Sequence, residues 1–373
     1  MAALREVFPH APVYTLAIDK RLRAEFHHWP IHPSPLQGIY DLIPSLPALL
    51  PLIPWAVRQL DFSAYDIVLS SSSLVTKGLR LPRHAIHICY CHTPPRFLWL
   101  DRESYLKQEL AGARKVLRPF LRLLLNYLTK VDYLDAQEVD YFLTNCKNCQ
   151  ERIQCFYGRG SEVIHPFVDS DLFYPEGTKE NYYLVAGRTQ GHKAVDLAIR
   201  AFNKNGRDLH VVGTGRALSF LKSIAGPNIR FLGRVGDDVL RREYCAARGY
   251  VFPQEEDFGI TPLEANACGT PVIAFRKGGA LETVMEGQTG IFFDKQTVES
   301  LCEAVEDFEH LQFQTRDLCE CASQFSKEKF KTQVRQFVGD VWRSRRGEPG
   351  VLNDDVARGR GVRGQSRARA IVP

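Results

Sequence analysis

The chain has 373 residues, of which 45% are hydrophobic and 24% charged, which is typical of a globular protein large enough for two domains. Its net charge of +5 arises in the Arg-rich stretch 343–373, whereas the remaining residues carry equal numbers of basic and acidic side chains, which argues against a broad nucleic-acid partner. The longest uncharged run, 42–57, contains four prolines and is too short for a membrane span.

The first half of the chain predicts strands joined by helical or irregular connections. The apolar runs that support these strands are 13–18, 67–73, 86–91 and 141–146. A further apolar run begins the stretch 162–177, which then becomes rich in Pro and Asp and is expected to link two domains.

One segment of the first half allows two interpretations. Residues 114–130, "RKVLRPFLRLLLNYLTK", combine five cations with a dense Leu, Phe and Tyr surface. A helix of this kind packs against a core in most proteins. A cationic amphipathic helix also lies in the plane of a membrane interface, so peripheral membrane contact stays open as the second interpretation.

The second half alternates regularly between short apolar runs and segments with helical spacing. The predicted strands are 182–187, 209–215, 229–233, 249–253, 271–275 and 290–293. The predicted helices between them are 193–202, 216–225, 237–247, 261–268 and 279–286. Strand and helix repeat about every 20 residues, which is typical of a doubly wound parallel sheet.

These patterns predict an α/β fold of two Rossmann-like domains that face a cleft. We expect an N-terminal domain at 1–168, a C-terminal domain at 169–325, a helix at 326–342 that returns to the N-terminal domain, and a disordered Arg/Gly-rich tail at 343–373. Ligands of such sheets bind at the carboxyl ends of the strands.

The ten cysteines are expected to be reduced thiols of a cytoplasmic protein, since the sequence shows no signal peptide. Cys89-x-Cys91 and Cys146-x2-Cys149 resemble metal-ligand spacings. No matching His/Cys cluster completes such a site, so a zinc centre is not favoured.

Glu256 and Glu264 lie eight residues apart in "EEDFGITPLEANACGTPVIAF" and allow two explanations. The first is structural: Thr261 is the N-cap of a helix, Pro262 its first residue, and Glu264 closes a capping box. The second is chemical, because Glu256 lies outside any cap, in a loop at the end of a strand.

The surroundings of this loop favour an anionic ligand with hydroxyl groups. Gly259 allows a close approach of the backbone, and the next helix presents free amides and a partial positive charge. Gly278 and Gly279 precede a second helix start, and the cations Arg188 and Lys193 follow the first strand of the domain. Two helix N-termini, two cations and two carboxylates at one sheet edge suit a nucleotide sugar, whose hydroxyls donate to ionised carboxylates.

Several segments together resemble the retaining glycosyltransferases of family 4. The segment "EEDFGITPLEANACGTPVIAF" followed by "KGGALETV" is similar to their Glu-x7-Glu signature, and "VAGRTQGHKAVDLAIRAF" is similar to their phosphate-binding segment. "HICYCHTPPRFLW" resembles the acceptor side of the bacterial mannosyltransferases of O-antigen and exopolysaccharide synthesis. "TNCKNCQERIQCFYGRGSEVIHPFVDSDLF" is similar to their domain junction, and the likeness extends from about residue 4 to residue 342.

The resemblance implies the GT-B fold and a role for each matching residue. Catalytic roles are implied for Glu256 on the donor sugar's hydroxyls, Arg188 and Lys193 on the diphosphate, and His92 facing the sugar. Donor-binding roles are implied for Phe258, Gly259, Ile260, Thr261, Glu264, Gly278, Gly279 and Glu282, with Glu264 on the ribose. For His92 a second interpretation, a satisfied core histidine, remains open.

The chain departs from the family pattern in three places. Ala194 stands where the family has a second cation after Lys193, and Asp169-x-Asp171 lies in the family's linker rather than in a metal site. The strand and glycine-rich loop with which the family begins have no counterpart here, so we expect an N-terminal domain without its first strand and weak transfer by the chain as given. Restoring about 25 upstream residues is expected to raise transfer.

The resemblance therefore predicts a metal-independent hexosyltransferase without a cofactor, most simply a mannosyltransferase that uses GDP-mannose. Its acceptor is expected to be a lipid-linked or growing surface polysaccharide, reached at the inner face of the membrane. UDP-glucose or another donor, or an inactive nucleotide-sugar-binding remnant, are the alternatives. A dinucleotide-dependent oxidoreductase is not favoured, because no Gly-x-Gly-x-x-Gly follows the first strand of a domain.

Overall fold

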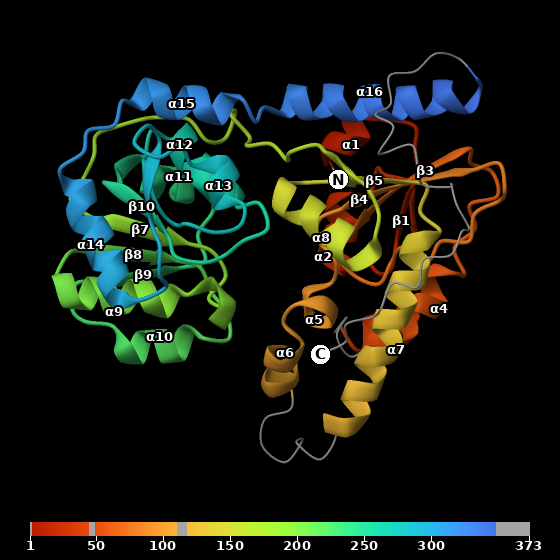
Figure 1. Ribbon diagram of the computed structural model, residues 1–373, viewed down its shortest axis with the longest axis horizontal. Coiled ribbons are helices and arrows are strands. Elements are labelled where there is room, and N and C mark those ends of the chain that lie inside the picture. Colours follow the sequence, from red (N-terminus) through yellow and green to blue (C-terminus); the bar gives the residue numbers. More distant parts are fainter. Residues whose placement is uncertain (1, 45–48, 110–117, 348–373) are drawn as a thin grey trace. The chain divides into compact units, whose positions relative to one another are not determined.

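A computed structural model describes residues 2–44, 49–109 and 118–347. They form two compact units, coloured by sequence in Figure 1. Unit 1 contains residues 2–9, 145–148 and 164–336, and unit 2 contains residues 10–144 and 149–163 together with the described residues after 336. The main boundary thus lies at 163/164, a few residues before the expected position, and two short stretches of the first half belong to unit 1.

Unit 1 is built on a six-stranded parallel sheet in the order β12-β11-β10-β7-β8-β9. Its strands are β7 (Tyr183–Ala186), β8 (Leu209–Val212), β9 (Ile229–Gly233), β10 (Gly249–Phe252), β11 (Val272–Phe275) and β12 (Gly290–Phe293). Three central strands, β7, β10 and β11, are buried along their whole length, which explains their uninterrupted apolar sequences. The predicted doubly wound sheet of the second half is confirmed.

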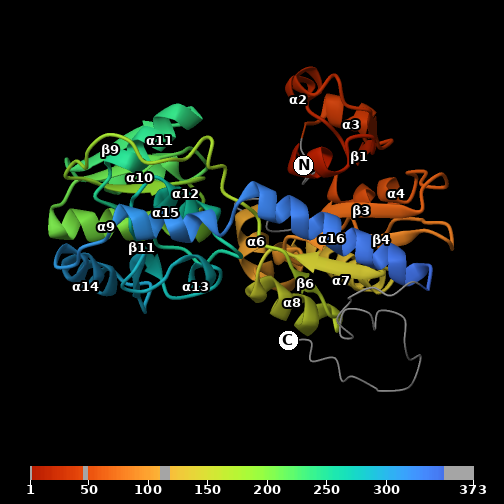
Figure 2. The ribbon, with the colours of Figure 1, turned by 90° about the horizontal axis from the view of Figure 1, so that it is seen from above.

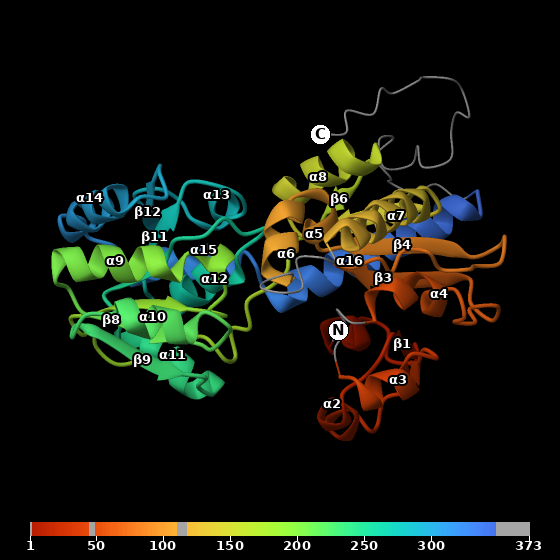
Figure 3. The same cartoon turned by 90° about the horizontal axis from the view of Figure 1, so that it is seen from below.

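Helices cover both faces of this sheet. They are α9 (Val195–Asn205), α10 (Leu218–Ile224), α11 (Asp237–Ala246), α12 (Ile260–Ala267), α13 (Ala280–Thr283), α14 (Val298–Glu309) and α15 (Thr315–Ser323). Unit 1 also contains α1 (Ala2–Val7) and the 3-10 turn η3 (Gly191–Lys193). Figure 1 shows α9 and α10 on one side of the strands and α12 and α15 on the other. Viewed from above and from below, Figures 2 and 3 bring these two helical layers forward in turn.

Unit 2 contains a four-stranded parallel sheet in the order β3-β4-β5-β6. Its strands are β3 (Ile67–Ser72), β4 (Ile86–Cys91), β5 (Tyr141–Thr144) and β6 (Glu162–Val163). The first predicted strand does not join this sheet: β1 (Val13–Thr15) pairs instead with β2 (Ile31–Pro33) in a separate two-stranded sheet. Both strands have only three residues and neither is fully buried, so their pairing is set by local contacts rather than by a continuous core.

The helices of unit 2 lie between its strands in the sequence. They are α2 (Lys20–Glu25), α3 (Gln37–Leu42), η1 (Leu50–Leu52), α4 (Ile53–Val57), α5 (Arg96–Trp99), α6 (Arg102–Glu109), α7 (Arg118–Gln137) and α8 (Lys147–Tyr157). Beneath α7, the fully buried ammonium of Lys77 donates to Asp132 at 2.9 Å, and Asp132 also accepts from Trp99 and Tyr157. This hydrogen bonding compensates the burial of the ion pair.

The predicted helix at 114–130 corresponds to α7, although residues 114–117 lie outside the described residues. One face of α7 packs into the core through Leu125, Leu128 and Val131. The other face exposes large apolar side chains, with Phe120 at 70% and Leu123 at 67% exposure. The core-packing interpretation therefore describes one face of the helix and leaves the other face unexplained.

The last described helix, α16 (Lys327–Arg345), is longer than expected. The prediction of disorder from residue 343 is wrong for its first residues, because Arg343 pairs with Asp340 within the helix and Arg346 stacks on Trp342. The rest of the predicted tail, 348–373, lies outside the described residues. Within the described ranges, no helix has both the length and the apolar character needed to span a bilayer.

Candidate functional site

The loop between β10 and α12 brings Glu256 to the carboxyl end of the sheet in unit 1. The central strands β10 and β7 are neighbours, so the loop after β10 meets the segment after β7. There the ammonium of Lys193, at the end of η3, forms an ion pair with the carboxylate of Glu256. The structure thus brings together two residues that the sequence had predicted for one site from segments 63 residues apart.

The backbone after β7 adopts a specific local conformation. Ala194 has a φ of 48°, in the left-handed region, at the junction between η3 and α9. A β-carbon makes this conformation unfavourable, so the surrounding contacts must hold the turn that carries Lys193. Arg188 is exposed at the start of the same segment, and among the described residues its guanidinium has no hydrogen bond or ion pair.

Gly278 and Gly279 let a second loop lie directly against the Glu256 loop. The amide of Gly279 donates to the carbonyl of Glu256 at 2.9 Å. A Cβ on Gly278 would lie 2.4 Å from that carbonyl oxygen, and one on Gly279 would lie 2.2 Å from the carbonyl oxygen of Phe258. Packing between the loops therefore already requires both glycines, and their contact with a donor stays a prediction.

Helix α12 begins one residue earlier than expected, and the predicted capping box is wrong. Gly259, with a φ of 80°, is the N-cap, and Ile260 is the first helical residue. Thr261 lies inside the first turn of the helix, so it is not the N-cap residue. Glu264 therefore does not occupy the third helical position and cannot close a capping box.

Glu264 faces the helix α11 instead. Its carboxylate accepts a hydrogen bond from the hydroxyl of Tyr244 at 3.1 Å. Burial raises the pKa of Glu264 to about 7, the Tyr244 hydrogen bond opposes the rise, and the negative charge of Asp237 adds to it. The raised pKa makes Glu264 a candidate for a functional carboxylate, and its predicted contact with a ribose stays a prediction.

Glu282 of α13 lies in the same unit but has partners of its own. Its carboxylate accepts from the amide of Lys147 at 2.9 Å and from His165 Nε2 at 3.0 Å. Burial alone would raise the pKa of Glu282, but the bonds from His165 and from the Lys147 amide lower it overall. Its predicted contact with the donor remains a prediction.

The remaining residues predicted to bind the donor differ in how far their side chains are buried. Phe258 is buried, and its ring packs beside His165 and Phe325 at 5.5 and 5.8 Å between centroids. Ile260 is 37% exposed at the start of α12. The loop for which backbone contacts to a donor are predicted thus has side chains that are partly packed in the core of unit 1, and those contacts stay a prediction.

His92 belongs to unit 2, where it follows β4. The interpretation as a core histidine is wrong, because the side chain is exposed. Its Nε2 lies 2.8 Å from the hydroxyl of Ser71, and its amide donates to the carbonyl of Ser72, at the carboxyl end of the neighbouring strand β3. The position at strand ends is typical of a ligand-binding residue, and its role stays a prediction.

Three residues that contact the predicted residues or their loop were not predicted for this site: Tyr244, His165 and Cys146. Tyr244 occupies an ordinary amphipathic helix position, and the Cys146 thiol donates to the carbonyl of Asp257 at 2.8 Å. His165 lies in the predicted linker, and its sequence context indicates no further role. The sequence marks Cys146 only as part of a Cys-x2-Cys spacing and gives no local pattern for Tyr244 or His165, since each acquires its role from a segment far away in the chain.

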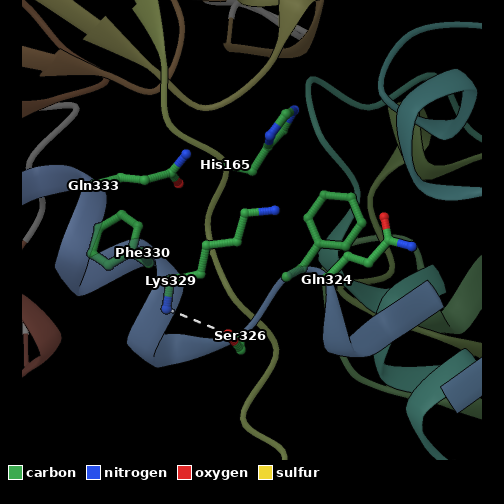
Figure 4. A pocket seen from close by; sticks show the side chains of 7 residues that line it. His165, Gln324, Ser326, Lys329, Phe330 and Gln333 are labelled. Carbon is green, nitrogen blue, oxygen red and sulfur yellow. Dashed lines mark hydrogen bonds between the residues drawn. The ribbon is translucent and has the colours of Figure 1, made fainter. Parts of the chain in front are cut away.

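A pocket of about 160 Å³ lies beside His165 in unit 1, at the start of α16. Figure 4 shows the side chain of Lys329 directed toward His165 and away from Gln333. The amide of Lys329 bonds the hydroxyl of Ser326 at 3.3 Å. The pocket is small, and the ammonium of Lys329 and the side-chain amides of Gln324 and Gln333 make its lining partly polar.

A search for metal ligands among residues 2–44, 49–109 and 118–347 finds no group of three or more His, Cys, Asp or Glu side chains that could hold an ion. Asp169 and Asp171 form a local turn, in which the Asp171 amide donates to the Asp169 carboxylate at 3.2 Å. The positive group that the structure places on Glu256 is the ammonium of Lys193. Metal independence remains a prediction.

Comparison with known families identifies residues 173–329 as similar to the family described as Glycosyl transferases group 1. The GDP-mannose-dependent alpha-(1-6)-phosphatidylinositol monomannoside mannosyltransferase of Mycolicibacterium smegmatis is 30% identical over 190 residues, 42% of this chain and 50% of the relative. The D-inositol 3-phosphate glycosyltransferase of Geodermatophilus obscurus is 32% identical over 191 residues, 42% of each chain. The chain spans about half the length of the curated relatives it matches.

Two solved structures share the fold over most of the chain. The sucrose-phosphate synthase of Thermosynechococcus elongatus has a TM-score of 0.63 at 18% identity, covering 84% of each chain. The Anabaena protein HepE, solved with UDP and glucose, also has a TM-score of 0.63 at 18% identity, covering 91% of this chain and 95% of its own. These likenesses show the fold, two Rossmann-like units of the GT-B type, and the family match supports a transferase of the group 1 kind.

Proposed function

We propose that this chain is a retaining glycosyltransferase that moves a hexose from a nucleotide sugar to a lipid-linked or growing surface polysaccharide. The observation that carries the proposal is the meeting of Lys193 and Glu256 at the carboxyl ends of β7 and β10. Both residues lie in the segment that matches glycosyltransferase group 1. An ion pair at a strand-end site supplies one group for the diphosphate and one for the sugar hydroxyls.

In the proposed reaction the departing diphosphate accumulates negative charge as the bond to the sugar breaks. Arg188 and Lys193 stabilise this charge, together with the amides at the start of α12, because they are positioned before the reaction begins. On donor binding, the Lys193 ammonium exchanges its carboxylate partner for phosphate oxygens. Glu256 is then available to accept hydrogen bonds from the sugar.

The ribose of the donor is assigned to Glu264. A carboxylate accepts a sugar hydroxyl more strongly when it is ionised. Because burial holds the pKa of Glu264 near 7, binding of a ribose to the ionised form would release a proton at neutral pH. This coupling distinguishes a ligand-binding carboxylate from one that only packs against Tyr244.

GDP-mannose is the donor that we propose first. The support comes from the mycobacterial relatives, whose names specify GDP-mannose and a phosphatidylinositol mannoside. Such an acceptor is a lipid, which agrees with an acceptor presented at a membrane surface. We therefore propose that the protein acts in the cytoplasm, at the inner face of the membrane.

The exposed face of α7 supports peripheral membrane contact. Phe120, Leu123 and Tyr127 are spaced along one side of the helix, and each is more than half exposed. Lys130 lies three residues after Tyr127 and is exposed, so it adds a cation on this side of the helix. Arg118 and Arg122, by contrast, lie toward the opposite side and pair with Glu103 in exposed salt bridges. An exposed apolar stripe with a cation beside it suits an anionic lipid surface.

The test is a panel of nucleotide sugars measured by thermal shift and by release of nucleoside diphosphate. We expect GDP-mannose and GDP to stabilise the protein, with about 2.7 kcal/mol at a ligand concentration 100 times the Kd. Stabilisation by UDP-glucose alone would change the donor and keep the reaction class. Binding without turnover, even with lipid extract as acceptor, would support an inactive binding protein, and no binding of any nucleotide would refute the proposal.

A further inference from the structure

The carboxylate of Glu282 is fully engaged by backbone and side-chain donors. Its Oε1 accepts from the Lys147 amide at 2.9 Å and its Oε2 from the same amide at 3.1 Å. The Asn148 amide lies 3.4 Å from Oε1, and His165 Nε2 lies 3.0 Å from Oε2. Only 13% of the Glu282 side chain is exposed, so little of the carboxylate is left for another ligand.

The donors to Glu282 come from two places where the chain passes between the units. Residues 145–148 are a short stretch of unit 1 between two segments of unit 2. Residue 164 is where the chain enters unit 1 for the long segment 164–336. One carboxylate in unit 1 therefore bonds two of the segments at which the chain enters this unit, through the amide of Lys147 and the ring of His165.

The same crossings contact the loop that carries Glu256. The Cys146 thiol donates to the carbonyl of Asp257 at 2.8 Å, and the rings of His165 and Phe258 lie 5.5 Å apart. The loop that leads into α13 is joined to this cluster, since the amide of Gly279 donates to the carbonyl of Glu256. Residues 145–148, 165, 256–258 and 279–282 thus form one connected network.

The charge on Glu282 suits this contact. Two amides at the start of α8 and one imidazole face it, and a carboxylate near a helix N-terminus is favoured by the unpaired amides there. Charge-assisted bonds of this kind are about twice as strong as neutral ones. These bonds therefore connect residues 145–148 to α13.

We propose that Glu282 is a positioning residue, which holds the crossings at 145–148 and 165 against the Glu256 loop, and that it does not bind the donor directly. The proposal rests on the proposed function only in treating the Glu256 loop as the donor loop. It differs from the role that resemblance implied for Glu282. A residue that binds the nucleotide sugar through a carboxylate needs that carboxylate free to accept hydrogen bonds. The Glu282 carboxylate already accepts from three groups of the protein.

The first test is hydrogen exchange of the full chain, read at the amides of Lys147 and Asn148. In Glu282→Gln, the charge-assisted bonds become neutral, and we expect these amides to exchange about tenfold faster, with a larger change in Glu282→Ala. Glu286→Gln is the matched control, because this nearby exposed carboxylate pairs with Arg276 and touches neither amide. Unchanged exchange at both amides in Glu282→Ala would overturn the proposal.

The second test separates positioning from ligand binding. For Glu282→Gln we expect the Kd of GDP to stay within about twofold while release of GDP from saturating GDP-mannose falls roughly tenfold, because the Glu256 loop is less ordered in the reacting complex. A Kd raised about 30-fold with normal exchange at Lys147 and Asn148 would make Glu282 a donor ligand and refute the proposal. If the wild-type protein binds no nucleotide, the proposed function fails, and the exchange result still decides the role of Glu282.

Discussion

The pKa of Glu264 leads to a specific prediction about stability and pH. The carboxyl titrates near pH 7 in the folded protein and near 4.5 in the unfolded chain. Because the folded state binds this proton more tightly, the proton's contribution to stability is complete below pH 4.5 and is lost as the pH rises through 7. At 1.36 kcal/mol per pKa unit, the loss is about 3 kcal/mol, an upper value because part of the residue remains exposed to water.

The assay compares the melting temperature of the wild-type protein with that of Glu264→Gln from pH 5 to pH 8.5. The glutamine stays neutral throughout and keeps an acceptor for Tyr244. The melting temperature of the variant should therefore rise relative to that of the wild type as the pH rises. About 3 kcal/mol corresponds to roughly 6–12 °C for a unit of this size. Because both proteins are measured at the same pH, the effects of all other titrating groups on the melting temperature cancel in the difference.

A second variant tests the cause of the shift. The bond from Tyr244 lowers the pKa of Glu264, so Tyr244→Phe should move the stability loss to higher pH. Nucleotide affinity should rise between pH 6 and 8 in the wild type and stay flat in Glu264→Gln if the ionised carboxylate holds the ribose. A melting-temperature difference that does not vary with pH would refute the reasoning from burial.

Further measurements address the site and the surface. Glu256→Gln should lower the rate of transfer roughly 30- to 1000-fold with little change in melting temperature, whereas the neighbouring Glu255→Gln, whose carboxylate pairs with Lys277, should retain activity; equal rates for both variants would exclude the role of Glu256. Activity should survive excess chelator, because cations and helix amides oppose the diphosphate charge; loss with chelator and recovery with Mg²⁺ or Mn²⁺ would contradict this. Flotation with anionic vesicles at low salt should recover the protein, and Leu123→Gln with Tyr127→Gln should reduce it; no flotation of the wild type would leave α7 with its core-packing role alone.

The sequence by itself determined the architecture of unit 1 and the neighbourhood of its candidate site. Each of its six strands is a short apolar run next to a helix with 3.6-residue spacing, and such patterns record burial within a single segment. Since the carboxyl ends of parallel strands share one edge, the proximity of Lys193 and Glu256 also followed from the order of the elements.

Only the tertiary structure decided which groups meet these residues. Glu264 could be a cap or a ligand until the start of α12 at Ile260 removed the capping box and α11 supplied Tyr244. Glu282 bonds an amide 135 residues away, and β1 leaves the main sheet of unit 2 to pair with β2. Such contacts depend on register and packing between distant segments, and local periodicity carries no information about them.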